Sequence, residues 1–184
     1  MTGPSGCPPG TPTAPIPAPD PSERKAAAGC PFCAEDMDAR TFRSDRWNLA
    51  VYNIAPVLPG HALVLPRRHV RSVLDLDDEE FARFFLFARR ITRLLARAFD
   101  ADGFDWTIQD GASAGQTVPH LHLHVIPRHA GDLPEPGDWY PALQASEAAP
   151  IDSAVRPRLS EAEHARITRH LRVLVEDPLD PPRS

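Results

Sequence analysis

Three histidines alternate with apolar residues in the stretch His120-Leu-His-Leu-His-Val-Ile126. In an extended strand, successive side chains point to opposite faces of the sheet, so the three imidazoles would share one face, about 6.6–6.8 Å apart. The intervening Leu121, Leu123 and Val125 would point into a core. Burying three imidazoles side by side without a function is costly. The spacing therefore indicates a site in which imidazole is a nucleophile or a metal ligand.

The sequence around these histidines suits an anionic ligand. Between Gly111 and Gly131 there are four histidines and Arg128 but no carboxylate. The small residues from 111 to 115 would let backbone N–H groups approach a phosphate closely. The paired carboxylates of a glycosidase have no candidates here. A catalytic zinc ion held by three histidines is a second possibility, although side chains at i, i+2 and i+4 of a strand diverge and rarely bind one ion together.

A second group of reactive side chains lies in Cys30-Pro-Phe-Cys33. Two thiolates at this spacing form half of a tetrahedral zinc site. The segment also resembles the redox dithiol of glutaredoxins, and Thr117-Val-Pro119 resembles the proline loop of that family. The two segments lie farther apart than they do in glutaredoxins, which favours the metal site. Cys7 is expected to be a bystander.

The stretch from Gln109 to Asp132 resembles the signature of the histidine-triad (HIT) superfamily, His-φ-His-φ-His-φ-φ with φ apolar. The Gly-Gln-Thr before the triad and the Pro-Arg-x-Ala-Gly-Asp after it are similar to the fragile-histidine-triad branch. The segment from Asn53 to His69 resembles the second conserved block of the superfamily. With the cysteine pair and the last helix, the resemblance covers about residues 30–176. It implies a HIT-like α+β fold.

The resemblance also implies an enzyme. Members of this branch cleave dinucleoside polyphosphates, such as diadenosine tri- or tetraphosphate, at the α-phosphate through a nucleotidyl-histidine intermediate and release AMP. Mg²⁺ would travel with the polyphosphate and neutralise its charge. The alternatives within the superfamily are a nucleoside phosphoramidate or acyl-nucleotide hydrolase. A nucleotide-binding sensor with slow turnover is a third reading. Family members form homodimers across the long helix and an edge strand, so a homodimer is expected.

Site roles follow from the resemblance residue by residue. His122 matches the nucleophile, while His124 and His61 match positions that hold phosphate oxygens and stabilise developing charge. Gln116 matches the residue beside the α-phosphate and the leaving group. The resemblance also implies that Asn53 contacts the ribose and that Leu63 lines the base pocket. Gln109 matches a residue that contacts a phosphate, and Thr117 matches the hydroxyl residue next to Gln116. A purely structural role in the core is the alternative for Leu63.

A structural zinc ion is implied by other members of the superfamily. Those members carry a Cys-x-x-Cys pair, a histidine after the second strand and the first histidine of the triad. Here these are Cys30, Cys33, His69 and His120. The fragile-histidine-triad branch lacks the cysteine pair, so this chain combines features of two branches. Such a closed site would stabilise the fold and fix the His120 ring beside the nucleophile, without activating water.

Hydrophobic periodicity and turn signals predict the strands and helices that carry these residues. Asp77-Asp-Glu-Glu80 predicts the start of an amphipathic helix that runs to about Phe99, and Ser160 with Glu163 predicts the start of a last helix to about Glu176. His164 and His170 are expected on the surface of that helix. Residues 130–158 are expected to form a long loop. Strands are predicted over residues 48–54, 61–65, 104–109 and 118–126. The irregular order of strands and helices predicts an α+β class with a mostly antiparallel sheet.

Composition sets the remaining expectations. The net charge of −5 and pI of about 5.9 disfavour a nucleic-acid binder. No run reaches the about 18 apolar residues that a membrane span requires, and the first residues lack a secretory pattern, so a cytoplasmic protein is expected. Proline accounts for 22 of the 184 residues and is concentrated at the ends. This predicts a disordered proline-rich tail over residues 1–28, a domain over 29–176 and a C-terminal tail over 177–184.

Overall fold

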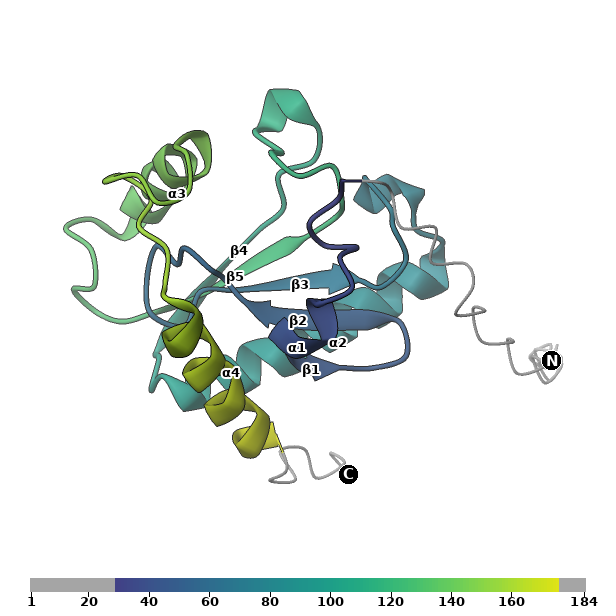
Figure 1. Ribbon diagram of the computed structural model, residues 1–184, viewed down its shortest axis with the longest axis horizontal. Helices are drawn as coiled ribbons and strands as arrows, with labels where there is room; N and C mark the ends of the chain where they lie inside the picture. Colours follow the sequence, from purple (N-terminus) through teal and green to yellow (C-terminus); the bar gives the residue numbers. More distant parts are fainter. Residues whose placement is uncertain (1–28, 176–184) are drawn as a thin grey trace, which may run out of the picture.

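The computed structural model describes residues 29–175 and has a five-stranded antiparallel sheet at its centre (Figure 1). The strand order is β1-β2-β3-β5-β4, so the α+β prediction is confirmed. Both predicted tails lie outside the described residues. The strands are β1 (Thr41–Ser44), β2 (Asn48–Tyr52), β3 (Ala62–Pro66), β4 (Gly103–Thr107) and β5 (Leu123–Arg128).

The two predicted helices begin where the capping residues place them. At the start of the long helix, the Asp77 carboxylate accepts the Glu80 N–H at 2.8 Å and the Glu80 carboxylate accepts the Asp77 N–H at 3.1 Å. Ser160 and Glu163 make the same reciprocal pair before the last helix. The helices are α1 (Met37–Arg40), α2 (Asp78–Ala98), α3 (Trp139–Ala148) and α4 (Glu161–Val175).

Alternation along the strands gives the sheet two different faces. One face packs on α2 and α4 and forms the main core, whose fully buried side chains include Phe84, Leu95 and Leu123. As predicted, Leu121, Leu123 and Val125 all belong to this core. The opposite face carries a small cluster around Leu63. Because Leu63 pairs with His124 in the β3–β5 register, the histidines lie on this second face.

Strand β5 differs from the prediction at both ends. The strand begins at Leu123, and residues 117–122 lead into it as an irregular segment. It also continues through Pro127, which was expected to end it. The β3–β5 pairing stops at Val125, so the missing N–H of Pro127 interrupts no hydrogen bond with β3.

The predicted loop over residues 130–158 contains the helix α3, so that prediction was wrong. Pro141 lies in its first turn, where an N–H has no partner within the helix, and is therefore tolerated. Only Leu143 and Ser146 of α3 are buried, which is too few for a visible helical period. The short elements α1 and β1, of four residues each, were not predicted either.

The prediction that His164 lies on the surface was wrong as well. Its ring is buried, and Nε2–H donates to the Tyr52 carbonyl at the end of β2 over 2.9 Å. This hydrogen bond ties α4 to the sheet. His170, by contrast, is exposed as expected.

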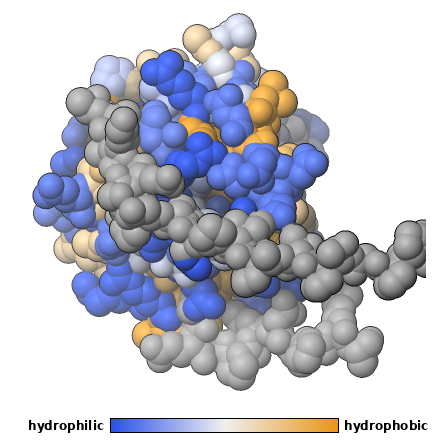
Figure 2. Space-filling model, turned by 90° about the vertical axis from the view of Figure 1, so that its right-hand side faces the viewer, coloured by the Kyte–Doolittle hydropathy of each residue, from blue (hydrophilic) through white to orange (hydrophobic). Residues whose placement is uncertain are grey.

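The outer surface is mainly polar. The face at the right of Figure 1 carries mostly hydrophilic residues wherever the described part of the chain is visible (Figure 2). Among the described residues, no helix has the length and apolar character needed to cross a membrane.

The turn between β2 and β3 yields a stability prediction. Gly60 has a φ of +88°, and a Cβ atom there would lie 2.7 Å from Pro127 Cγ and 3.0 Å from the Phe99 ring. We expect Gly60→Ala to lower the free energy of unfolding by about 3 kcal/mol, from backbone strain and overpacking together. Urea denaturation would measure this change.

Gly131→Ala is the matched control. Gly131 has a similar φ of +79° but open space around the Cβ position. Only the strain, about 1 kcal/mol, should appear there. Equal losses in the two variants would contradict the proposed contact with Pro127.

Candidate active site

The sheet brings three of the predicted histidines into one buried group. His124 lies on β5, His122 directly precedes that strand, and His61 directly precedes β3. The ring centroids of His122 and His124 are 4.9 Å apart, and those of His61 and His124 are 5.2 Å apart. His61 and His124 have no exposed surface, and His122 is 3% exposed. The rings are thus close enough to act on one ligand.

A hydrogen bond to the backbone determines which nitrogen of His122 is free. Nδ1 lies 2.8 Å from the His120 carbonyl oxygen, which can only accept, so Nδ1 carries the hydrogen. In the neutral ring Nε2 then keeps its lone pair. Burial lowers the pKa of His122 and outweighs the opposing effects of the His120 carbonyl and a nearby carboxylate, that of Glu147. The ring therefore stays neutral and nucleophilic at neutral pH.

A chain of hydrogen bonds assigns the other two rings. The Val57 N–H donates to His61 Nδ1 over 3.2 Å, so His61 carries its hydrogen on Nε2. That Nε2–H donates to His124 Nδ1 over 2.9 Å, which leaves the His124 hydrogen on Nε2. His124 Nε2 is buried and has no hydrogen-bond partner among the described residues. It is a donor available to a ligand oxygen.

Burial keeps these hydrogen-bonded histidines uncharged. It lowers the pKa of His61 to about 3, with smaller contributions from His122 and Arg156. It also lowers the pKa of His124 well below its usual value, again with help from the neighbouring cations and rings. Each ring therefore has one donor and one acceptor.

One of the predicted nucleotide contacts, Asn53, borders this histidine group, and another, Gln109, lies beside the small-residue loop. The Asn53 amide oxygen accepts the Ala55 N–H at 3.0 Å, and its amide nitrogen lies 3.2 Å from His61 Nε2. Gln109 is buried, and its Oε1 has no partner among the described residues. A Cβ atom on Gly115 would lie 2.9 Å from Gln109 Nε2, so the small-residue loop closes tightly over this amide.

The other predicted contacts are engaged by the protein itself. Gln116 accepts the Gly111 N–H at 3.0 Å and donates to the Arg71 carbonyl at 2.8 Å, which holds the loop together. Thr117 is exposed and donates its hydroxyl to Glu147 at 2.7 Å. Arg128 is paired with Asp105 and Asp132 and lowers the pKa of Asp132 to about 2. It is therefore not available for an anionic ligand.

Sequence reasoning missed two charged residues at the site. Glu147 lies on α3, and its carboxylate and the ring nitrogens of His122 and His124 are all within 4.8 Å of one another. Arg156 contacts Glu147, with Nη2 3.5 Å from the carboxylate and Nη1 donating to the main-chain carbonyl at 3.3 Å. Both residues fall in the segment predicted as a loop, and no motif marks them.

Four side chains that can bind a metal ion form a second cluster beside the histidine group. His120 Nδ1 lies 3.5 Å from Cys30 Sγ and 3.6 Å from Cys33 Sγ, and His69 Nδ1 lies 3.4 Å from Cys33 Sγ. His120 Nε2–H donates to the Pro66 carbonyl at 3.0 Å, which leaves the Nδ1 lone pair facing the thiols. The predicted set thus converges, and it can hold a metal ion.

Phe32 connects the two clusters. Phe32 lies between the two cysteines in the sequence. Its ring makes edge contacts with the rings of His120 and His122, at centroid distances of 5.8 Å and 5.2 Å. It also packs on the small apolar cluster around Leu63. The cysteine loop therefore forms part of the wall around His122.

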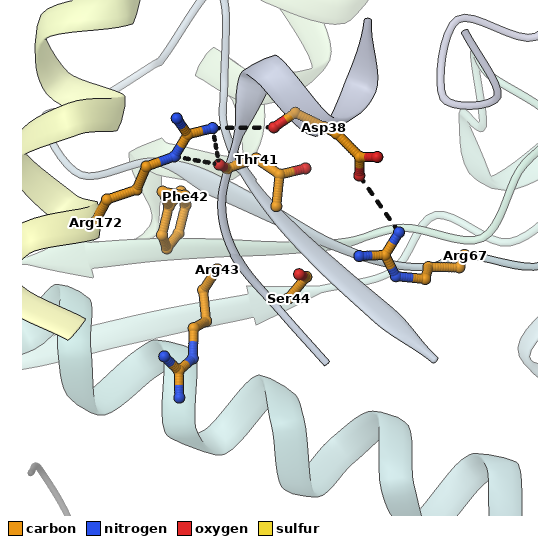
Figure 3. A pocket seen from close by; sticks show the side chains of 7 residues that line it. All are labelled: Asp38, Thr41, Phe42, Arg43, Ser44, Arg67 and Arg172. Carbon is orange, nitrogen blue, oxygen red and sulfur yellow. Dashed lines mark hydrogen bonds and ion pairs between the residues drawn. The ribbon is translucent and has the colours of Figure 1, made fainter. Parts of the chain in front are cut away.

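A separate hollow lies between β1, α1 and α4 and contains none of the site histidines (Figure 3). Two of its three arginines, Arg67 and Arg172, bind other groups of the protein. Arg172 donates to the carbonyls of Asp38 and Thr41, at 2.9 Å and 2.6 Å, and Arg67 pairs with the Asp38 carboxylate. We assign no ligand to this hollow.

The depressed pKa of His61 predicts acid sensitivity. In the unfolded chain this ring takes up a proton below its ordinary pKa of 6.5, whereas in the folded protein it does so only near pH 3. The stability that it contributes is therefore lost progressively as pH falls from about 6.5 toward 3, by about 2 kcal/mol at pH 5. Between pH 7 and pH 5, His61→Gln should lose about 2 kcal/mol less than the wild type in urea denaturation.

His129→Gln serves as the control, because His129 is exposed. This variant should keep the full loss of the wild type. If His61→Gln and the wild type lose equal stability over this pH range, the neutral buried state of His61 is wrong.

Comparison with known proteins agrees with this arrangement. The HIT domain family model matches residues 35–131. A bis(5'-adenosyl)-triphosphatase from Dictyostelium discoideum is 47% identical over 92 residues, which cover 50% of this chain and 62% of that protein. An asymmetrical bis(5'-nucleosyl)-tetraphosphatase from Schizosaccharomyces pombe is 38% identical over 116 residues, which cover 63% and 64%. The chain thus spans just under two thirds of the length of these two relatives.

A solved structure shares the fold. The crystal structure of a zinc-bound histidine triad family protein from Mycobacterium smegmatis has a TM-score of 0.59 and 29% identity, and the match covers 80% of this chain and 96% of that one. The family match extends over more than half of the chain and includes the entire histidine group. The protein therefore belongs to the histidine-triad (HIT) family.

Proposed function

We propose that this protein is a nucleotide hydrolase or transferase that cleaves a dinucleoside polyphosphate at the α-phosphate and releases AMP. The observation that carries the proposal is the pairing of a free lone pair on His122 Nε2 with an unpartnered hydrogen on His124 Nε2. One group suits attack on phosphorus, and the other suits a phosphate oxygen. The names of the two curated relatives support this substrate class.

In the first step His122 Nε2 forms a bond to the α-phosphorus, and the bond to the bridging oxygen breaks. The leaving nucleotide carries away the electron pair of that bond. His124 Nε2–H donates to an oxygen of the phosphoryl group, and the hydrogen-bonded His61 lets it share the developing charge. In the second step water attacks phosphorus and the P–N bond breaks. The electron pair of that bond returns to His122 Nε2, the proton of the water passes to solvent, and AMP leaves; an acceptor other than water would instead carry the nucleotidyl group away.

Further contacts are proposed for the neighbouring polar residues. We expect Asn53 to contact the ribose and Leu63 to contact the base, and the unpartnered amide oxygen of Gln109 is a spare acceptor near the loop. Gln116 and Thr117 would contact the α-phosphate region after giving up their present partners. Mg²⁺ is expected to accompany the polyphosphate and neutralise part of its charge.

Substitution of the nucleophile tests the mechanism. We expect His122→Ala to lower hydrolysis of diadenosine triphosphate by at least about 10³-fold, because the variant lacks the imidazole that forms the adduct. Folding and AMP binding should persist, as measured by thermal unfolding and calorimetry. Rapid quenching of the wild type should trap AMP covalently bound to His122.

His129→Ala, a change at an exposed histidine, should retain wild-type rates. Undiminished hydrolysis by His122→Ala would refute the nucleophile assignment. Parallel assays with diadenosine tetraphosphate, an adenosine phosphoramidate and an acyl-adenylate separate the favoured substrate from the alternatives. Turnover of none of them would favour the nucleotide-binding sensor.

We also propose that Cys30, Cys33, His69 and His120 hold a structural zinc ion. Tetrahedral coordination with Zn–S of about 2.3 Å and Zn–N of about 2.0–2.1 Å puts sulfur and nitrogen ligands about 3.5 Å apart. The observed separations of 3.4–3.6 Å fit this value. Four protein ligands leave no open position, so zinc would supply folding energy rather than activate water. The zinc-bound relative from Mycobacterium smegmatis supports the choice of metal.

Elemental analysis tests the metal. The purified protein should contain about one zinc ion per chain, and Cys33→Ser should lose it and unfold at a lower temperature, because three ligands hold the ion less tightly. Cys7→Ser is the matched control and should keep the full zinc content. A zinc-free wild type with freely reactive thiols would instead favour the redox dithiol.

A homodimer across α2 and the edge strand β4 is supported by a row of aromatic rings that joins Phe81, Phe85, Trp106 and Phe104. Phe81 and Phe104 are 47% and 53% exposed, so the row reaches the surface. A cytoplasmic location is supported by the need of the cysteine cluster for a reducing compartment. We retain residues 29–176 as the domain and the two ends as tails.

A further inference from the structure

The carboxylate of Glu147 occupies space that a substrate phosphate would need. It lies within 4.8 Å of one ring nitrogen each of His122 and His124 and accepts the Thr117 hydroxyl at 2.7 Å. A phosphoryl group bonded to His122 would bring its own negative oxygens into the same space. The carboxylate and the phosphate therefore compete for one position.

The Glu147 side chain is itself largely enclosed by the protein. Leu143 and Ser146 bury one side of α3, and the Glu147 side chain is only 8% exposed. The partner guanidinium of Arg156 is 14% exposed. This arrangement belongs to the interior of the site rather than to a solvated surface pair.

The Glu147 carboxylate leaves some hydrogen-bond donors of the site without a partner. Its contact with Arg156 Nη2 is 3.5 Å, long for a charge-assisted hydrogen bond, which is usually about 2.7–2.9 Å. Arg156 Nε and His124 Nε2 are both buried donors without partners among the described residues. A tetrahedral phosphate has more acceptor oxygens than a carboxylate, so it can engage donors that Glu147 leaves free.

A metal ion is the alternative to a phosphate as the ligand of His122, His124 and Glu147. Such an ion would bind the lone pair of His122 Nε2 and would face the hydrogen of His124 Nε2. The hydrogen-bond chain through His61 therefore favours an anion over a cation at this position.

Building on the function proposed above, we propose that Glu147 is a substrate-displaced gate and that Arg156 is a phosphate-binding residue. The incoming phosphate displaces the carboxylate and takes over the Arg156 guanidinium and the Thr117 hydroxyl. Ligands enter only when their phosphate contacts outweigh those of Glu147, so the pair determines specificity for highly anionic substrates.

Calorimetry with AMP and with inorganic tripolyphosphate tests the gate without turnover. Glu147→Gln keeps the shape of the side chain and removes its charge, so it should bind AMP about tenfold more tightly. Arg156→Gln should bind tripolyphosphate about tenfold more weakly, and Arg156→Lys should recover part of that loss. Thermal unfolding of each variant checks that it is folded.

The pair Asp152 and Arg158 provides matched controls in the same segment, because their side chains are 61% and 45% exposed. Asp152→Asn and Arg158→Gln should bind both ligands like the wild type. If Arg156 only positions Glu147, Arg156→Gln will bind more tightly, as Glu147→Gln does, and the proposal fails. It also fails if Glu147→Gln binds no more tightly than the wild type. An inactive protein that shows the expected binding shifts would refute the hydrolase proposal alone.

Discussion

The hydrogen bond from His122 Nδ1 to the His120 carbonyl is the constraint on which the site depends. It fixes the tautomer of the ring, and the tautomer decides where the lone pair lies. The same residue, His120, directs its own Nδ1 toward Cys30 and Cys33 because its other nitrogen donates to Pro66. One short backbone segment therefore orients both the proposed nucleophile and the sulfur-rich cluster.

Burying four imidazoles in one half of a small sheet requires compensation. Three of them, His61, His120 and His124, have no exposed surface at all. The chain meets this requirement in two ways. Most ring nitrogens of these histidines have a partner in the protein, whereas His124 Nε2 is left for a ligand, and the opposite face of the sheet contributes the large apolar core under α2. Most of the apolar burial thus lies on one face of the sheet, and the histidine chemistry lies on the other.

The residues that could be predicted from the sequence are those with short-range signals. The alternating histidines, the capping pair at Asp77 and the cysteine spacing each carry their own physical rule. The resemblance to the HIT family then brought His61 and His69 to the two clusters, where the structure places them. Glu147 had no such signal, because α3 buries too little apolar surface to show a period, and Arg156 lies in the irregular segment after α3, where no pattern marks it. His164 was misjudged because a hydrogen bond to a distant carbonyl leaves no local pattern.

The link between Arg172 and α1 affects the order in which the chain matures during synthesis. The guanidinium of Arg172 is the partner of carbonyls more than 130 positions earlier, at Asp38, Ala39 and Thr41. Translation proceeds from the N-terminus, so the cysteine loop and α1 leave the ribosome long before this arginine exists. These carbonyls can therefore gain the Arg172 guanidinium as a partner only after nearly the whole described chain has been synthesised.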